Sequence, residues 1–461
     1  MKVVILAGGG GTRLFPLSRE SRPKQFMAID DDRSLLVHTI ERFKNICQMS
    51  DILIVTNERY RYHVKSELAA CGATGAHIIL EPQARNTAPA IALAATYCMD
   101  VLGCSKDEVL FVSTSDHIIR PANVFAASVE KAVKLAMSSC IVTFGVPPTY
   151  PATGFGYIEA KASYGTEGAY VAGDVKEKPD INTARRYLKK GNYYWNSGMF
   201  VFQIRCYLEE VARYEKHIAS CMTDSYKEMR QRFHEMPNIS IDYAIAEKSK
   251  RMVVLPLKLY WNDVGSWDAI HEVLDKDVNG NAIKGDCIAL DCKNTLIMGN
   301  NRLITCVGLE NIIVVETQDV ILVAQKGKSQ RVKDLVGELK KRGRREAVAH
   351  MTIYHPWGSY TTLGEGDGYR MKKMVINPGG TVPCHMHYNR SEHWIVASGT
   401  ARFFRDGEIK ILRENEGAFS PMGCLHGIEN PGKIPLEVIE VQNGKYLDED
   451  DMVIEKKVDM K

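Results

Sequence analysis

Several features are scarce in this chain of 461 residues, and each scarcity excludes a class of protein. The twelve cysteines include no Cys-x-x-Cys pair, which excludes a zinc ribbon and a thioredoxin motif and favours free thiols in a reducing compartment. Neither sign of charge dominates, because 59 basic residues face 56 acidic ones. We therefore expect neither nucleic acid nor a membrane surface as a partner.

Long hydrophobic runs are also missing. The longest apolar stretch with a helical pattern, residues 88–98, is too short to span a bilayer. The N-terminus enters a strand-like segment at once and shows no pattern of a signal peptide. We therefore expect a cytoplasmic protein.

The length of the chain and the pattern of its apolar residues predict more than one domain. Within residues 1–275, short and nearly unbroken apolar runs alternate with amphipathic segments, which is typical of strands covered on both faces. This pattern predicts a doubly wound, Rossmann-like α/β domain with a parallel sheet and ligands at the carboxyl ends of its strands. The expected strands are 2–6, 52–56, 109–113 and 141–146, and the expected helices are 35–44 and 89–101.

The rest of the chain has a different texture. Residues 276–327 consist of short β-rich segments separated by Asn, Asp and Gly, which predicts a small all-β unit compatible with a few coils of a β-helix. Residues 328–350 form a charged segment with a helical pattern, and we expect a solvated linker there. Alternating strands with Gly and Pro turns in residues 351–461 predict an antiparallel β-barrel or sandwich.

The first expected strand runs directly into four glycines, Gly8 to Gly11. Without Cβ atoms, the backbone N–H groups of such a turn can converge on an anion. Arg13 and Lys24 add positive charge nearby, so the loop is predicted to bind a polyphosphate. It has neither the Gly-Lys-Ser/Thr ending of a P-loop nor the last glycine of the dinucleotide fingerprint. The alternative is a glycine-rich turn that only reverses the strand.

Two acids are placed for a divalent cation. Asp116 follows the buried strand 109–113, and Asp263 follows an apolar segment at residues 252–257. Strand ends of this kind form the ligand edge of an open α/β sheet, and carboxylate oxygens suit Mg²⁺. Either aspartate by itself could instead be a turn or capping residue.

The glycine loop and its surroundings carry a family resemblance. Gly8-Gly9-x-Gly11-Thr12-Arg13-Leu14-x-Pro16-Leu17-Ser18-Arg19, followed by Pro23-Lys24-Gln25-Phe26, resembles the signature of the sugar-phosphate nucleotidylyltransferases. Nearly the whole chain is similar to the two-domain (type II) mannose-1-phosphate guanylyltransferases, in which the transferase is joined to a cupin-type mannose-6-phosphate isomerase. The resemblance implies transfer of GMP from GTP to mannose 1-phosphate with Mg²⁺, giving GDP-mannose and pyrophosphate.

The same resemblance implies roles for individual residues. Charge neutralisation and metal binding for the transfer step fall to Arg13, Lys24, Asp116 and Asp263. The triphosphate is implied to lie on Gly8, Gly9, Gly10, Gly11 and Thr12, and the base near Glu81, Arg85, Asn86 and Thr87. The sugar phosphate is implied to contact Gly154, Glu177, Lys178 and Asn196.

The last region contains both cupin motifs, with His385, His387, Glu392 and His426 as candidate metal ligands. Residues 385 and 387 are two apart, so on one strand they share a face. Three imidazoles and one carboxylate suit a divalent transition metal such as Zn²⁺, Fe²⁺ or Mn²⁺. By resemblance this cupin isomerises mannose 6-phosphate and fructose 6-phosphate.

The cupin also departs from the family pattern. Tyr388 and Asn389 stand where the type II enzymes usually have histidines, which could alter contacts with a sugar phosphate. An alternative is therefore a guanylyltransferase whose cupin is a non-catalytic sugar-binding, regulatory or oligomerisation module. A homo-oligomer is compatible with either hypothesis.

Overall fold

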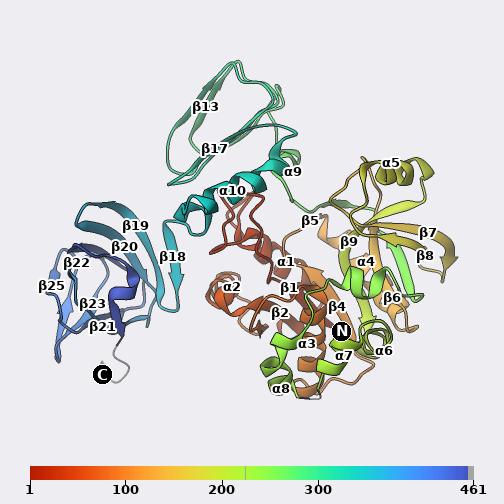
Figure 1. The fold of residues 1–461 in the computed structure, drawn as a ribbon, viewed down its shortest axis with the longest axis horizontal. Helices are drawn as coiled ribbons and strands as arrows, with labels where there is room; N and C mark the ends of the chain where they lie inside the picture. Colours follow the sequence, from red (N-terminus) through yellow and green to blue (C-terminus); the bar gives the residue numbers. More distant parts are fainter. Residues whose placement is uncertain (224, 455–461) are drawn as a thin grey trace. The chain divides into compact units, whose positions relative to one another are not determined.

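The computed structural model describes residues 1–223 and 225–454 and divides into two compact units, Met1–Ala347 and the part from Val348 onward (Figure 1). No helix in these described ranges is long and apolar enough to cross a membrane.

A mixed β-sheet forms the centre of the first unit, with nine strands among the described residues in the order β3-β2-β1-β4-β9-β6-β10-β8-β7. The strands are β1 (Lys2–Leu6), β2 (Ile52–Asn57), β3 (His77–Glu81), β4 (Val109–Thr114), β6 (Ile141–Val146), β7 (Tyr157–Tyr164), β8 (Ala169–Lys176), β9 (Tyr193–Gln203) and β10 (Met252–Pro256). Strands β3, β2, β1 and β4 are parallel, as are β6 and β10.

The prediction of a parallel sheet is wrong at β9, which runs antiparallel to both β4 and β6. The hairpin of β7 and β8 is also antiparallel. The residues of β9 are buried from both sides, and such an apolar run reads the same in either chain direction. The β7–β8 hairpin and α5 separate β6 from β9 in the chain, and the local pattern does not record the direction in which the chain returns to the sheet.

Helices cover both faces of the sheet, which confirms the doubly wound α/β class. Alternate residues of β1 show this, since Val3 and Ile5 belong to one hydrophobic cluster and Val4 to the other. The first cluster contains residues of α1 (Leu35–Lys44), α2 (Arg61–Ala70) and α4 (Ala122–Ala136). The second contains residues of α3 (Thr87–Asp100) and α6 (Ile204–Tyr214).

The shorter elements of this region are β5 (Ile118–Arg120), α5 (Ile181–Lys190), α7 (Lys216–Cys221), α8 (Tyr226–Gln231), β11 (Tyr260–Asn262) and α9 (Trp267–Val273).

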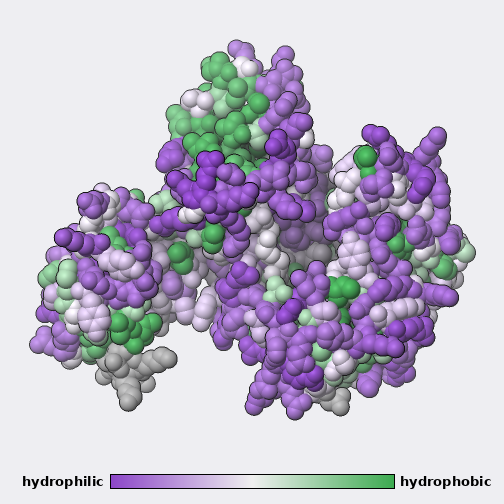
Figure 2. All heavy atoms as spheres, in the orientation of Figure 1, coloured by the Kyte–Doolittle hydropathy of each residue, from purple (hydrophilic) through white to green (hydrophobic). Residues whose placement is uncertain are grey.

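A short β-helix follows within the same unit. Its strands are β12 (Ala282–Lys284), β13 (Cys287–Leu290), β14 (Leu296–Met298), β15 (Ile304–Val307), β16 (Ile312–Glu316) and β17 (Ile321–Gln325). Strands β12, β14 and β16 pair in parallel, as do β13 and β15, around buried Ile297 and Val314. Figure 2 shows apolar side chains on the surface over β13 and β17, and the exposed ones include Ile288, Leu290, Val307, Ile321 and Val323.

Helix α10 (Val332–Lys341) occupies the charged segment that was expected to be a linker. Its Val332 and Val336 are buried in the same cluster as Leu14, Phe15 and Trp267. The helix therefore packs against the segment that follows the glycine loop.

The second unit is a two-sheet cupin, with β18-β19-β20-β27-β22-β25 facing β24-β23-β26-β21-β28. Its strands are β18 (Thr352–His355), β19 (Gly358–Gly366), β20 (Tyr369–Ile376), β21 (Thr381–His387), β22 (Arg390–Ser398), β23 (Ala401–Arg405), β24 (Glu408–Leu412), β25 (Gly417–Ser420), β26 (His426–Glu429), β27 (Leu436–Gly444) and β28 (Met452–Ile454). Residues of both sheets, including Ile376, Val438, Phe403 and Ile428, share one apolar core.

Candidate active sites

The first unit contains a cavity of about 620 Å³ at the carboxyl ends of β1, β3 and β4, with a second cavity of about 420 Å³ around the glycine loop. The sequence-predicted residues that line one or both are Gly8, Gly9, Gly10, Gly11, Thr12, Arg13, Lys24, Glu81, Asn86, Thr87, Asp116, Gly154, Glu177, Lys178, Asn196 and Asp263. Arg85 lies outside both linings, and its guanidinium donates instead to the backbone carbonyl of His234.

The Pro-Lys-Gln-Phe segment holds the glycine loop through hydrogen bonds to its backbone. Gln25 is buried and its amide Nε2 donates to the carbonyl oxygens of Ala7 (2.9 Å) and Gly9 (3.1 Å). Phe26 is fully buried in the core and anchors this short 3-10 turn. The packing of Phe26 thus fixes both the loop and the neighbouring Lys24.

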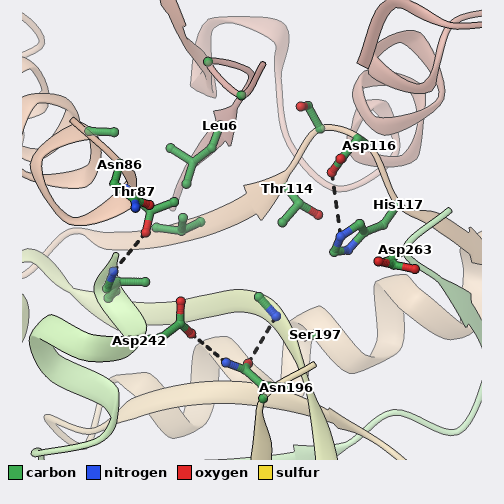
Figure 3. Close-up of a pocket in the computed structure, with 18 of the residues that line it drawn as sticks. Leu6, Asn86, Thr87, Thr114, Asp116, His117, Asn196, Ser197, Asp242 and Asp263 are labelled. Atoms are coloured by element: carbon green, nitrogen blue, oxygen red, sulfur yellow. Dashed lines mark hydrogen bonds and ion pairs between the residues drawn. The ribbon is translucent and has the colours of Figure 1, made fainter. Parts of the chain in front are cut away.

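Lys24 lies between the two predicted metal-binding aspartates. Its Nζ donates to Asp116 Oδ2 at 2.8 Å and to the backbone carbonyl of Asp263. Strands β5 and β11 pair antiparallel with Asn262 opposite Ile118, which places Asp263 beside Asp116 and His117 (Figure 3). The structure therefore brings together the cation and both carboxylates, which are far apart in the sequence.

Lys24 has a strong influence on the charge state of Asp116. Burial raises the pKa of Asp116, but the Lys24 ammonium and His117 outweigh it, so the pKa lies below its ordinary value. Burial lowers the pKa of His117 to about 4. Near neutral pH, Asp116 is therefore ionised and the His117 imidazole is neutral. A carboxylate that stays ionised beside a second acid is suited to a hard divalent cation.

Asp263 is oriented by Gly265, whose backbone N–H donates to Asp263 Oδ1 at 3.1 Å. A Cβ at Gly265 would lie 2.5 Å from Asp263 Oδ2, so a side chain at this position would displace the carboxylate. Trp267 is fully buried and donates its Nε1–H to the carbonyl of Phe15 at 3.0 Å. The Asp-Val-Gly-Ser-Trp motif therefore connects Asp263 with the segment that carries Arg13.

On the opposite side of the glycine loop lies Glu81, the last residue of β3. Burial raises the pKa of Glu81 to about 7. A Cβ at Gly8 would lie 2.7 Å from Glu81 Oε2, so the glycine allows the carboxylate to approach the loop. Thr87 begins α3 and lines the same cavity as Glu81, and its Oγ1 accepts from the backbone N–H of Ile241 at 2.9 Å.

A polar network forms the far end of the larger cavity. Lys178 donates to Glu177 at 2.6 Å, and Asn196 Nδ2 donates to Asp242 Oδ1 at 2.7 Å (Figure 3). The Asn196 Oδ1 accepts from Thr143 Oγ1 at 3.0 Å, which fixes the orientation of the amide. Burial, and then the charge of Glu177, raise the pKa of Asp242 to about 6.

Sequence reasoning missed Asp242 and His117 as cavity residues. His117 follows Asp116 directly, so its position at the end of β4 was a usable signal. Asp242 begins a π-helix, η5 (Asp242–Ala246), and no strand end or glycine turn precedes it. Only the folded chain brings it to Asn196, because the two residues are 46 positions apart.

In the second unit, the four predicted cupin ligands converge. The ligand atoms of His385, His387, Glu392 and His426 all lie within 4.8 Å of one another, and all four residues are buried. The Nδ1 atoms of His385 and His426 lie 2.8 and 3.0 Å from the carbonyl oxygens of Pro383 and Cys424. A carbonyl only accepts, so each Nδ1 carries a proton, and Nε2 is the ring nitrogen that can bind a metal once it holds no proton.

Glu392 is the centre of this cluster. It lies 3.0 Å from the Nε2 atoms of both His387 and His426, and it accepts from Arg390 and Trp394 at 3.1 Å. Burial raises its pKa, but the hydrogen bonds from the two histidines hold it well below its ordinary value. The donor set of three imidazoles and an ionised carboxylate fits a divalent transition metal.

Comparisons with known proteins agree along the whole chain. The nucleotidyl transferase family matches residues 2–280, the MannoseP isomerase/GMP-like beta-helix domain matches 285–339, and the mannose-6-phosphate isomerase C-terminal family matches 342–456. The chain is 45% identical over 460 residues to the xanthan biosynthesis protein XanB of Xanthomonas campestris pv. campestris, covering 98% of this chain and 97% of that protein. It is 41% identical over 464 residues to the mannose-1-phosphate guanylyltransferase of Salmonella montevideo, again covering 98% and 97%. The chain belongs to the mannose-1-phosphate guanylyltransferase family.

A solved structure agrees with the fold of the first unit of this guanylyltransferase. The crystal structure named as a mannose-1-phosphate geranyltransferase from Thermus thermophilus aligns with a TM-score of 0.67 at 28% identity, and it covers 74% of this chain and 99% of that one.

In this member of the guanylyltransferase family, Tyr388 and Asn389, which depart from the usual cupin motif, are not among the four clustered residues. The Tyr388 side chain is 62% exposed. Asn389 donates its Nδ2 to Asp451 Oδ1 at 2.7 Å. Neither residue lines the cavity of about 360 Å³ that adjoins His385 and Glu392.

Proposed function

We propose that the first unit transfers GMP from GTP to mannose 1-phosphate. A phosphate oxygen of mannose 1-phosphate attacks the α-phosphorus of GTP, a new P–O bond forms, and the bond to the bridging oxygen of the β-phosphate breaks. The products are GDP-mannose and pyrophosphate. The observation that carries this proposal is the convergence of Lys24, Asp116 and Asp263 beside the glycine loop.

In the proposed transfer site, the cationic residues bind the phosphates and the carboxylates bind Mg²⁺. The loop N–H groups and Arg13 bind the triphosphate, and Lys24 neutralises charge that develops as the transferred group moves. Asp116 and Asp263 fit Mg²⁺, because both are carboxylates at one cavity and Asp116 is held ionised. A bound Mg²⁺ would supply further neutralisation of phosphate charge.

We assign the guanine base and the sugar phosphate to opposite ends of the larger cavity. We assign the guanine to Glu81, Asn86 and Thr87, because an ionised carboxylate can accept from the N1–H and N2–H₂ donors that distinguish guanine from adenine. We assign the sugar phosphate to Lys178, and the sugar hydroxyls to Glu177 and to the Asn196–Asp242 pair near Gly154. A point cation suits a phosphate, and carboxylates suit hydroxyl donors. For Arg85 we propose a structural role in its loop instead of the predicted contact with the base.

We propose that the cupin interconverts mannose 6-phosphate and fructose 6-phosphate. His385, His387, Glu392 and His426 would hold a divalent transition metal such as Zn²⁺, which would supply Lewis-acid stabilisation of negative charge on the sugar oxygens. Arg390 and Lys372 line the adjoining cavity and offer positive charge to the sugar phosphate. The location of Tyr388 and Asn389 away from this cavity supports a catalytic cupin over the alternative of a purely regulatory or oligomerisation module.

The two activities need a separate mutase between mannose 6-phosphate and mannose 1-phosphate. We place both in the cytoplasm, where GTP is available, and we expect no nucleic acid or membrane partner. Assembly into a homo-oligomer stays a prediction.

The test is a substrate panel on the purified chain. Four nucleoside triphosphates are each combined with several hexose 1-phosphates, and Mg²⁺-dependent release of pyrophosphate is measured. We expect the highest kcat/KM for GTP with mannose 1-phosphate. Absence of Mg²⁺-dependent turnover with this pair would reject the assignment.

A further inference from the structure

Helix α10 brings a cation to the cavity around the glycine loop. This cavity is lined by residues 9–14 of the loop segment, by Lys24, Asp116 and Asp263, and also by Lys333. Lys333 is the second residue of α10, which follows the β-helix and lies outside the part of the chain that forms the α/β sheet. A residue of the predicted linker segment therefore lies at the predicted triphosphate site.

Packing holds α10 against the glycine-loop segment. The neighbour of Lys333, Val332, is buried in one cluster with Leu14 and Phe15. Toward the other end of the helix, Lys340 forms an ion pair with Glu20. Contacts at both ends of α10 therefore fix the helix along residues 14–20, and the side chain of Lys333 faces the cavity between them.

Lys333 differs from the other basic side chains of this helical segment. Arg331 pairs with Asp334 (3.7 Å), Lys341 with Glu338 (4.0 Å) and Arg342 with Glu338 (3.0 Å). Within residues 1–223 and 225–454, no carboxylate lies within ion-pair distance of Lys333. A cation in the first turn also opposes the helix macrodipole, so helix stability does not account for a lysine at this position.

The charge balance of the cavity indicates what such a cation would bind. Arg13, Lys24 and Lys333 face Asp116 and Asp263, and Lys24 is already paired with Asp116. If the two carboxylates hold Mg²⁺ and Lys24 serves the transferred group, Arg13 and Lys333 are the other cations of this lining that can bind anionic groups. The β- and γ-phosphates of a nucleoside triphosphate match this need.

We propose that Lys333 binds the β- and γ-phosphates of GTP and the pyrophosphate that leaves, which makes α10 part of the nucleotidyl-transfer site. The inference rests on the proposed function and extends it to a residue beyond the α/β domain. In the transfer step, the bridging oxygen gains the electron pair of the broken bond, and the Lys333 ammonium stabilises the charge on the departing pyrophosphate.

The experiment compares the full-length wild type with Lys333→Gln, Lys333→Arg and the matched control Lys341→Gln, whose lysine lies on the same helix but away from the cavity. We expect Lys333→Gln to raise KM for GTP, and KM for pyrophosphate in the reverse reaction, by about tenfold, the usual size for loss of one charge-assisted hydrogen bond. KM for mannose 1-phosphate should stay within about twofold. Lys333→Arg should restore most of the loss, and Lys341→Gln should behave as the wild type.

A KM for GTP and for pyrophosphate within about twofold of the wild type in Lys333→Gln would overturn the inference, as would an equal rise for all substrates. Calorimetric titration of magnesium pyrophosphate into each variant separates this result from failure of the proposed function, because it needs no turnover. A wild type that makes no GDP-mannose but binds pyrophosphate about tenfold tighter than Lys333→Gln would refute the activity and leave the role of Lys333 standing. Equal pyrophosphate binding in the two proteins would refute the role of Lys333 whatever the activity.

Discussion

The cupin cluster and the transferase cavity differ in how far the protein's own residues are already arranged for binding. In the cupin, each of the four candidate metal ligands is buried, and the Nδ1 atoms of His385 and His426 are oriented by backbone carbonyls. In the transferase cavity, Arg13 is exposed and Lys24 forms an ion pair with Asp116, a carboxylate that we assign to Mg²⁺. The cupin residues are therefore already arranged as a set of metal ligands, while the proposed transferase site is completed only when a charged substrate binds.

The largest effect should come from removing the centre of the cupin cluster. We expect Glu392→Ala to abolish bound transition metal and to lower isomerase activity by more than about a hundredfold, because it removes a ligand and leaves buried histidines without their acceptor. Guanylyltransferase activity should be unchanged. Metal content by mass spectrometry and both activities are measured, with the exposed Glu408→Ala in the same unit as control. Full isomerase activity in a metal-free Glu392→Ala protein would refute the metal-dependent account.

Lys24→Ala should lower the guanylyltransferase activity and leave the isomerase activity unchanged. Loss of one preorganised cation typically costs about 10²–10³ in kcat, so GDP-mannose formation should fall by this factor while the isomerase is unaffected. Lys65→Ala, at an exposed position of α2, is the matched control. A rate within about threefold of the wild type would reject the role assigned to Lys24.

A smaller effect is expected from the acid beside the glycine loop. Because burial raises the pKa of Glu81 to about 7, the free protein holds this group mostly protonated at pH 6 and mostly ionised at pH 8. The ionised form accepts from guanine, so KM for GTP should fall by up to about tenfold as the pH rises through this range. Steady-state kinetics at several pH values test this.

The control for the pH profile is Glu81→Gln, which cannot titrate. Its KM for GTP should keep only the pH dependence of GTP itself. The same pH profile in wild type and Glu81→Gln would show that Glu81 does not read the base.

The smallest effect is expected at a position where the cupin departs from its family. The Tyr388 side chain is exposed and does not line the cupin cavity, so Tyr388→His should change isomerase kcat/KM by less than about twofold. The assay uses mannose 6-phosphate with coupled detection of fructose 6-phosphate. A gain of tenfold or more, on the order of 1.4 kcal/mol, would mean that the substitution at Tyr388 limits the isomerase.

Features set by short spacings could be predicted from the sequence. The glycine loop follows its strand directly, helix 35–44 has the predicted bounds, and His385 and His387 share a strand face because they are two residues apart. Asp116 could be placed at the end of a buried strand for the same local reason.

Features that depend on distant packing could not be predicted. Three features depend on segments whose own sequence patterns do not predict that they come together. They are the antiparallel direction of β9, the contact of Asp242 with Asn196, and the position of Lys333 at the cavity of the glycine loop. For Arg85, the motif predicts contact with the base, whereas its guanidinium donates to the His234 carbonyl in the folded loop.

The most direct test of the central claim follows the phosphorus atoms. Purified protein is incubated with Mg²⁺, mannose 1-phosphate and GTP labelled with ³²P at either the α- or the γ-phosphate, and the products are separated. The account predicts that α-label appears in GDP-mannose and γ-label in pyrophosphate, in equal amounts. Label from the γ-phosphate in the sugar product, or no labelled sugar nucleotide at all, would contradict it.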